Sequence, residues 1–118
     1  MKNGISTGKV MTFTAPTGGV VSGVPVLIGA LLVVPVATVA QTEKFAGETE
    51  GVISHTKVGS QAWTEGQVIY WDNTNKRFTN ASATGLFACG VAAEAVSNAA
   101  GNTIGKVRLN GVSLVAVA

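Results

Sequence analysis

Charged side chains are scarce in this chain. Only 12% of its 118 residues are Asp, Glu, Lys or Arg, whereas 47% are hydrophobic and the mean hydropathy is +0.40. The 8 Lys and Arg against 6 Asp and Glu give a net charge of +2 and a pI near 8.9, too weak an excess for a nucleic-acid-binding face. A small soluble monomer covers itself with charge, so we expect copies of the chain or a larger partner to cover this one.

Cysteine and histidine are almost absent, which excludes most catalytic and metal-binding chemistry. Cys89, the only cysteine, lies in an apolar stretch, so it predicts a buried, inert thiol and no disulfide within the chain. His55, the only histidine, is expected to be solvated or structural. Without a cluster of ligand-type residues no metal site is predicted. The chain is therefore expected to have no catalytic residue and no cofactor, and not to be an enzyme.

Three weaker patterns are better explained without chemistry. Glu48 and Glu50 would share a face of a predicted strand, where exposed solubilising carboxylates are expected. Residues 4–10 imitate a phosphate-binding loop, but they have three residues between the glycines instead of four and Val10 after the lysine. Interleaved basic residues are lacking around the aromatic ones, so core or interface packing is expected rather than base stacking. These aromatic residues are Trp63, Tyr70, Trp71, Phe78 and Phe87. Neither a nucleic acid nor a small-molecule substrate is expected as a partner.

A long uncharged run, residues 10–42, raises the question of a membrane span. Pro25 and Pro35 bracket only nine residues with Gly29 among them, and a helix there would lose backbone hydrogen bonds that lipid cannot replace. Flanking Lys or Arg clusters and interfacial Trp or Tyr are missing. We predict two short strands broken at Gly29 and no membrane partner. The first residues lack an apolar signal region, so synthesis in the cytoplasm is expected.

Glycine punctuates the rest of the chain and indicates an all-β fold. The 15 glycines separate short runs rich in Val, Ile, Thr and aromatic residues. We expect a single domain over residues 1–118, a small β-barrel or β-sandwich with an extended N-terminal arm at residues 1–8. A helix over residues 92–100 is the alternative to the end of one strand. Residues 20–24 lead into the two apolar strands. The other expected strands cover residues 9–15, 43–57 with bulges or bends at Gly47 and Gly51, 67–71, 77–79, 86–96, 104–109 and 112–117, with residues 72–76 as a hairpin tip.

Five short motifs, in this order and spacing, resemble a known family. They are APTGG at 15–19, VSGVPVLIG at 21–29, GQVIYWD at 66–72, CGVAAEA at 89–95 and GKVRLN at 105–110. The pattern is similar to that of the small phage proteins grouped as DUF2190, which look like capsid cement, or decoration, proteins of tailed bacteriophages. The resemblance covers nearly the whole chain. It implies a homotrimer that binds the major capsid protein on the outer surface of the virion and is made in the bacterial host cytoplasm.

Two sets of residues are candidates for these contacts. The N-terminal arm has too little apolar area to order alone, so we expect it to add as a strand to a sheet edge of the shell. Its candidate capsid-binding residues are Lys2, Asn3, Ile5, Ser6 and Thr7. Candidates for a subunit interface or the core are Leu27, Leu31, Leu32 and Val34. A nucleic-acid-binding recombination accessory protein and another head or tail subunit remain as alternatives.

Overall fold

The computed structural model describes residues 9–117, which form nine strands and no helix. The prediction of an all-β fold is confirmed. The alternative of a helix over residues 92–100 is wrong, because those residues after Ala92 are turns and irregular structure. The strands are β1 (Val10–Thr14), β2 (Val26–Ile28), β3 (Leu31–Pro35), β4 (Lys44–Glu48), β5 (Glu50–Thr56), β6 (Val68–Asp72), β7 (Arg77–Thr79), β8 (Phe87–Ala92) and β9 (Ile104–Asn110).

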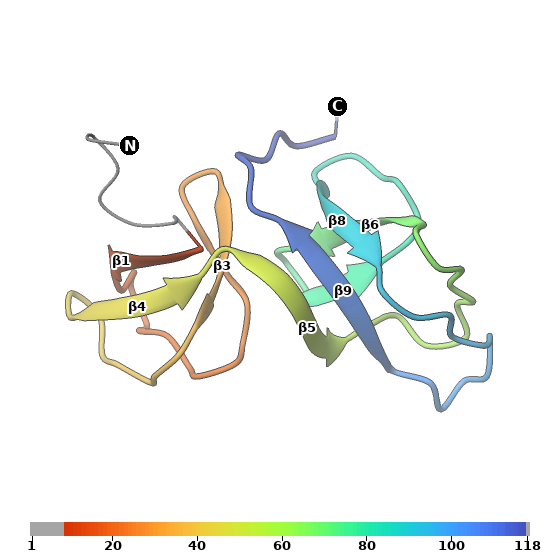
Figure 1. Ribbon diagram of the computed structural model, residues 1–118, viewed down its shortest axis with the longest axis horizontal. Helices are drawn as coiled ribbons and strands as arrows, with labels where there is room; N and C mark the ends of the chain where they lie inside the picture. The colour runs from red at the N-terminus through yellow and green to blue at the C-terminus, as the bar shows by residue number, and fades with distance from the viewer. Residues whose placement is uncertain (1–8, 118) are drawn as a thin grey trace.

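The strands form two antiparallel sheets that lie side by side (Figure 1). The N-terminal sheet has the order β1-β4-β3-β2, and the second sheet has the order β5-β9-β8-β6-β7. The two edge strands of the second sheet approach each other, because the Val58 N–H donates to the Phe78 carbonyl at 3.0 Å next to a parallel bridge between Lys57 and Phe78. We call this partly closed sheet the C-terminal barrel.

The uncharged run forms a tight hairpin, as predicted. β2 and β3 pair from Val26↔Val33 to Ile28↔Leu31, and Gly29 makes the turn with a φ of 60°. That conformation suits glycine, which has no Cβ to clash. Within residues 9–117 there is no helix that could span a bilayer.

Strand β3 is buried on both faces, which explains why its sequence is apolar without alternation. Val33, fully buried, points into a small cluster in the N-terminal sheet, where Phe45 packs. Leu32 and Val34 point the other way, into the core of the C-terminal barrel. One short strand therefore contributes to two hydrophobic clusters. The barrel cluster also contains Trp63, Ile69, Trp71, Phe78, Cys89, Ala92, Val107, Leu109 and Leu114.

The predicted strand over residues 43–57 is in fact two strands in different sheets. The break falls at Thr49, between β4 and β5, where the Thr49 N–H donates to the Lys9 carbonyl at 2.7 Å. Gly47 is not a bend, because its register with Met11 and Pro35 is regular. It is instead a close-packing position, where a Cβ would overlap the Cγ1 methyl of Val33.

The expected final strand over residues 112–117 is also wrong. This segment makes only an isolated bridge, between Ala116 and Phe87. Its Leu114 N–H donates to the Ala30 carbonyl at 2.6 Å, and the Leu114 side chain is buried in the barrel core. The segment therefore forms hydrogen bonds with two separate elements, the β2–β3 turn and the residues just before β8. It does not form one continuous ladder with a single strand. The strand expected over 86–96 likewise ends at Ala92.

The hairpin predicted from residues 67–79 is confirmed as β6 and β7. Ile69 and Trp71 point inward and are fully buried, as their alternation predicts. At the turn, the Asp72 carboxylate accepts hydrogen bonds from the backbone N–H groups of Thr74 and Asn75, at 3.0 and 3.1 Å. The tip is exposed from residue 74 to residue 76, whereas residues 72 and 73 are half-buried.

Candidate interaction surface

The interface candidates of the sequence do not gather at one place. Leu32 and Val34 are 3% and 7% exposed and lie in the core of the chain itself. Leu27 and Leu31 are half-buried, Leu27 against the barrel cluster and Leu31 against the cluster of the N-terminal sheet. The candidate capsid-binding residues Lys2, Asn3, Ile5, Ser6 and Thr7 lie outside the described residues.

The residues considered for catalysis have structural surroundings. The His55 Nε2–H donates a hydrogen bond to the Lys76 carbonyl, 3.1 Å away, and the ring contacts those of Trp71 and Phe78. Glu48 ends β4 and Glu50 begins β5, so the predicted shared strand face does not exist. In the part of the chain that the structure describes, no three His, Cys, Asp or Glu residues are grouped as a metal site requires.

Two reactive groups are buried in the barrel. The Cys89 thiol is 1% exposed and donates to the Ile69 carbonyl, and burial raises its pKa to about 12. Lys57 is also 1% exposed. Its Nζ donates to the carbonyls of Val58 at 2.7 Å and Asn102 at 3.0 Å, and lies 5.5 Å from the ring centroid of Trp63. Burial lowers the pKa of Lys57. Both side chains hold elements of the barrel together.

The main candidate for an interaction surface is a row of side chains across the outside of the barrel. The register places Val52 opposite Arg108, Arg108 opposite Val91, and Val91 opposite Val68, on four adjacent strands. Directly paired residues point to the same face of a sheet. Val52 is 60% and Val68 48% exposed, and Val91 is half-buried. We call these four residues the outer row.

Arg108 differs from Lys44, Lys57 and Lys76, which also lack an ion pair but donate side-chain hydrogen bonds within the described chain. Its neighbour on the same strand face, Lys106, forms an ion pair with Glu94 at 3.0 Å. Arg77 lies 4.0 Å from the Asp72 carboxylate. Arg108 has neither a hydrogen bond nor an ion pair within residues 9–117. An exposed guanidinium flanked by valines is typical of a protein interface, where arginine and apolar side chains are enriched and other charges are depleted.

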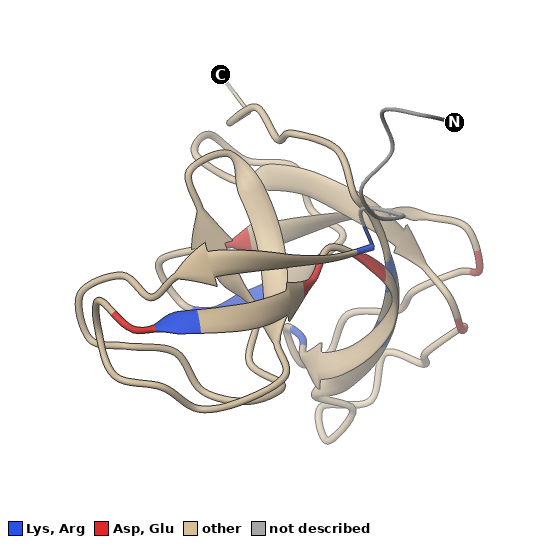
Figure 2. Cartoon of the chain, turned by 60° about the vertical axis from the view of Figure 1, so that its left-hand side comes forward, with Lys and Arg blue, Asp and Glu red and all other residues tan. Residues whose placement is uncertain are grey.

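Sequence reasoning missed the outer row. Alternation within each strand indicates that these side chains point outward, but only the strand order brings the three valines and the arginine together. The charged residues elsewhere are scattered singly or in pairs of opposite sign, and no continuous face of one sign is seen in Figure 2. The described residues in this view therefore show no basic stripe of the kind that nucleic-acid binding would need.

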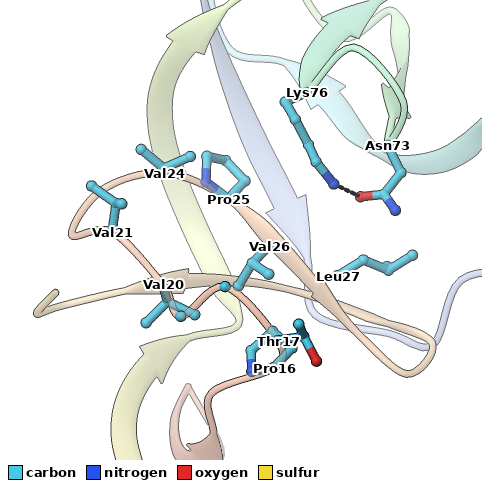
Figure 3. A pocket seen from close by; sticks show the side chains of 12 residues that line it. Pro16, Thr17, Val20, Val21, Val24, Pro25, Val26, Leu27, Asn73 and Lys76 are labelled. Carbon is cyan, nitrogen blue, oxygen red and sulfur yellow. Dashed lines mark hydrogen bonds between the residues drawn. The ribbon is translucent and has the colours of Figure 1, made fainter. Parts of the chain in front are cut away.

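A shallow hollow of about 430 Å³ lies between the β1–β2 loop and the β6–β7 tip (Figure 3). Its polar side consists of Lys76 and Asn73, whose side chains bond to each other at 2.9 Å. Its walls are mainly apolar and include Pro16, Val20, Val21, Val24, Pro25, Val26 and Leu27. The hollow has no convergent set of polar or titratable groups, and so no geometry for catalysis.

Comparison with known proteins identifies the family. No curated protein and no solved structure matches the chain significantly. The model of one protein family, described as phage cement protein, matches residues 5–109. This match covers both sheets, with eight of the strands complete and β9 lacking only its last residue, Asn110. The chain therefore belongs to the phage cement protein family, whose members are structural proteins associated with the phage capsid.

Proposed function

We propose that this protein binds the outer surface of a tailed-phage capsid and cements adjacent subunits of the major capsid protein. The observation that carries the proposal is the family match over residues 5–109. The scarcity of charge supports it, because a chain with only 12% charged residues is suited to permanent contacts. Contacts repeated at every lattice site add up, so a weak single contact can hold a shell together.

The outer row is our candidate for the contact with the shell. Its three valines supply apolar area, and Arg108 supplies a cation that has no counter-ion among residues 9–117. A carboxylate on a capsid subunit would pair with this guanidinium, and the surrounding valines would exclude water from the pair. Arginine anchors of this kind commonly dominate the free energy of an interface.

The N-terminal arm is a second proposed contact. Residues 2–8 would add as a strand to a sheet edge of the shell, with Ile5 in a shallow pocket and Lys2 beside an acidic group. We also propose that the protein acts as a homotrimer, with the exposed parts of Leu27 and Leu31 among the contacts between copies.

The test is the occupancy of purified capsids that lack the protein. Wild-type protein should bind at saturating stoichiometry and raise the temperature at which the heads rupture. Arg108→Gln should weaken binding by about tenfold or more. Lys106→Gln is the matched control, because it removes the same charge from the same strand face but its lysine already has an intrachain partner. Deleting residues 2–8 should also lower occupancy while leaving the thermal unfolding of the free protein unchanged.

Three results would count against parts of this function. Equal occupancy for both glutamine variants would remove the outer row as the contact surface. Undiminished binding after the deletion would do the same for the arm. Localisation of the chain to the tail or neck of the particle, seen in a density map, would replace the cement function with that of another structural subunit.

A further inference from the structure

Strand β1 leaves one side of the N-terminal sheet open. In the sheet order it is a terminal strand, and β4 is the only described strand that pairs with it. Four of its five residues are exposed, and only Phe13 is half-buried. Proteins normally protect such an edge with a lysine, a proline or a bulge. Residues Val10–Thr14 contain none of these, and their pairing with β4 is regular.

The backbone groups on the open side can be assigned. The Thr49 N–H donates to the Lys9 carbonyl at 2.7 Å, and the Ala15 N–H donates to the Glu43 carbonyl at 2.8 Å. Alternate residues of an antiparallel strand bond to the same partner, so the odd-numbered residues of β1 face β4. The N–H and C=O groups of Val10, Thr12 and Thr14 consequently face away from the sheet.

We propose that this edge pairs with β1 of a second copy, antiparallel and centred on Thr12. The register would then place Thr12 opposite Thr12, Val10 opposite Thr14, and Met11 opposite Phe13 of the other copy. Each of the outward-facing pairs exchanges two hydrogen bonds, giving about six across the junction. The eight strands of two N-terminal sheets would form one continuous sheet.

The side chains fit a copy of this strand well. Met11 is 43% exposed and would pack on the half-buried Phe13 of the other copy, extending the small cluster of the N-terminal sheet. On the opposite face Val10, 48% exposed, would meet the methyl group of Thr14, and the two Thr12 side chains would pair. Lys9 would fall opposite Ala15, so the pairing brings no like charges together.

This junction has two-fold symmetry, so it cannot itself close a trimer. On an icosahedral shell, neighbouring three-fold positions are related by two-fold axes, and β1 pairing would join the proteins bound at such positions. That placement rests on the proposed cement function. The pairing of the two β1 strands does not depend on that function. A short junction of this kind gains most from the high local concentration of copies on a lattice.

Cysteine cross-linking tests the pairing and its register. Thr12→Cys should form disulfide-linked dimers on mild oxidation, in concentrated free protein, on decorated capsids, or in both. Val10→Cys and Thr14→Cys should cross-link to each other when mixed, and much less when either is oxidised alone. The buried native Cys89 adds no background. Val115→Cys is the matched control, because it is exposed in the segment after β9, outside the junction and the outer row, and should yield at least about tenfold less dimer.

A proline variant supplies an independent readout. Thr12→Pro removes only an N–H that faces the open side, so it should abolish the mixed cross-link while the circular dichroism of the protein stays unchanged. No cross-link above the Val115→Cys level, both in solution and on capsids, would overturn the pairing. Capsid binding without a cross-link would overturn the pairing alone, whereas cross-linking without capsid binding would overturn the cement function alone.

Discussion

Gly47 lies so close to Val33 that a Cβ at position 47 would overlap the Val33 Cγ1 methyl. The two residues lie on neighbouring strands, β4 and β3, and Val33 is fully buried. The contact lets the small cluster of the N-terminal sheet close around a short strand pair. Glycine is needed here for its lack of a side chain rather than for a special backbone conformation.

Gly47→Ala should therefore destabilise the protein by about 1–3 kcal/mol, the usual effect of overpacking a core. Urea unfolding followed by tryptophan fluorescence measures the free energy of unfolding. Gly101→Ala is the control, because a Cβ there meets nothing within 4 Å and its φ is not positive. Equal stability of the two variants would show that Val33 can move aside without loss.

Burial of Lys57 should make stability depend on pH in the alkaline range. The pKa of Lys57 is lowered in the folded protein below its ordinary value of 10.5, so between the two pKa values the unfolded chain binds more protons and stability rises with pH. The neutral amine still has two N–H groups for the Val58 and Asn102 carbonyls. As the pH rises toward 10.5, wild type should gain stability relative to Lys57→Met. The same dependence of the free energy of unfolding on pH in the two proteins would contradict this.

Cys89 should resist thiol reagents in the folded protein. Its pKa of about 12 leaves almost no thiolate at neutral pH, and its side chain is 1% exposed. Ellman's reagent should react with it only at the rate of unfolding. Ala88→Cys places a thiol on the opposite, exposed face of β8 and should react at once. Fast labelling of both cysteines in that variant would mean that the barrel opens readily.

Asp72 should stabilise the β6–β7 turn through its carboxylate. Asp72→Ala removes hydrogen bonds to Thr74, Asn75 and the Asn75 side chain, and should lower the free energy of unfolding by about 1–2 kcal/mol. The Asn75 side-chain hydrogen bond is the main cause that lowers the pKa of Asp72 below 3.8. Its stabilisation is therefore complete above that pH and is lost as the pH falls through the lower, folded value. Thr74→Ala, which keeps the backbone contact, should behave as wild type.

Local chemistry was sufficient to predict several elements of this fold. The turn at Gly29, the β6–β7 hairpin and the buried Cys89 each follow from a few neighbouring residues. The break at Thr49 could not be predicted from its neighbours, because threonine favours strands and the change of sheet depends on the distant Lys9 carbonyl. Residues 112–117 have strand-like composition, but the tertiary contacts of Leu114 override it.

The candidate surfaces were the least predictable part of the molecule. The sequence indicates that the chain should be covered by partners. It does not reveal which strands pair, or in which register, and so which exposed side chains become neighbours. Val52, Val68, Val91 and Arg108 are separated by many residues and meet only because β9 inserts between β5 and β8. The open side of β1 likewise depends on the order of strands, which no local pattern specifies.

The two-sided burial of β3 has a consequence for how the molecule comes apart. Removing β3 would expose Leu32 and Val34 of the barrel core and Val33 of the other cluster together. Loss of β3 from either half would disturb the packing of the other, because alternate residues of this one strand belong to the two clusters. Melting should therefore be cooperative, a single all-or-none transition, and a protein fixed to a shell at one end would hold its other end folded as well.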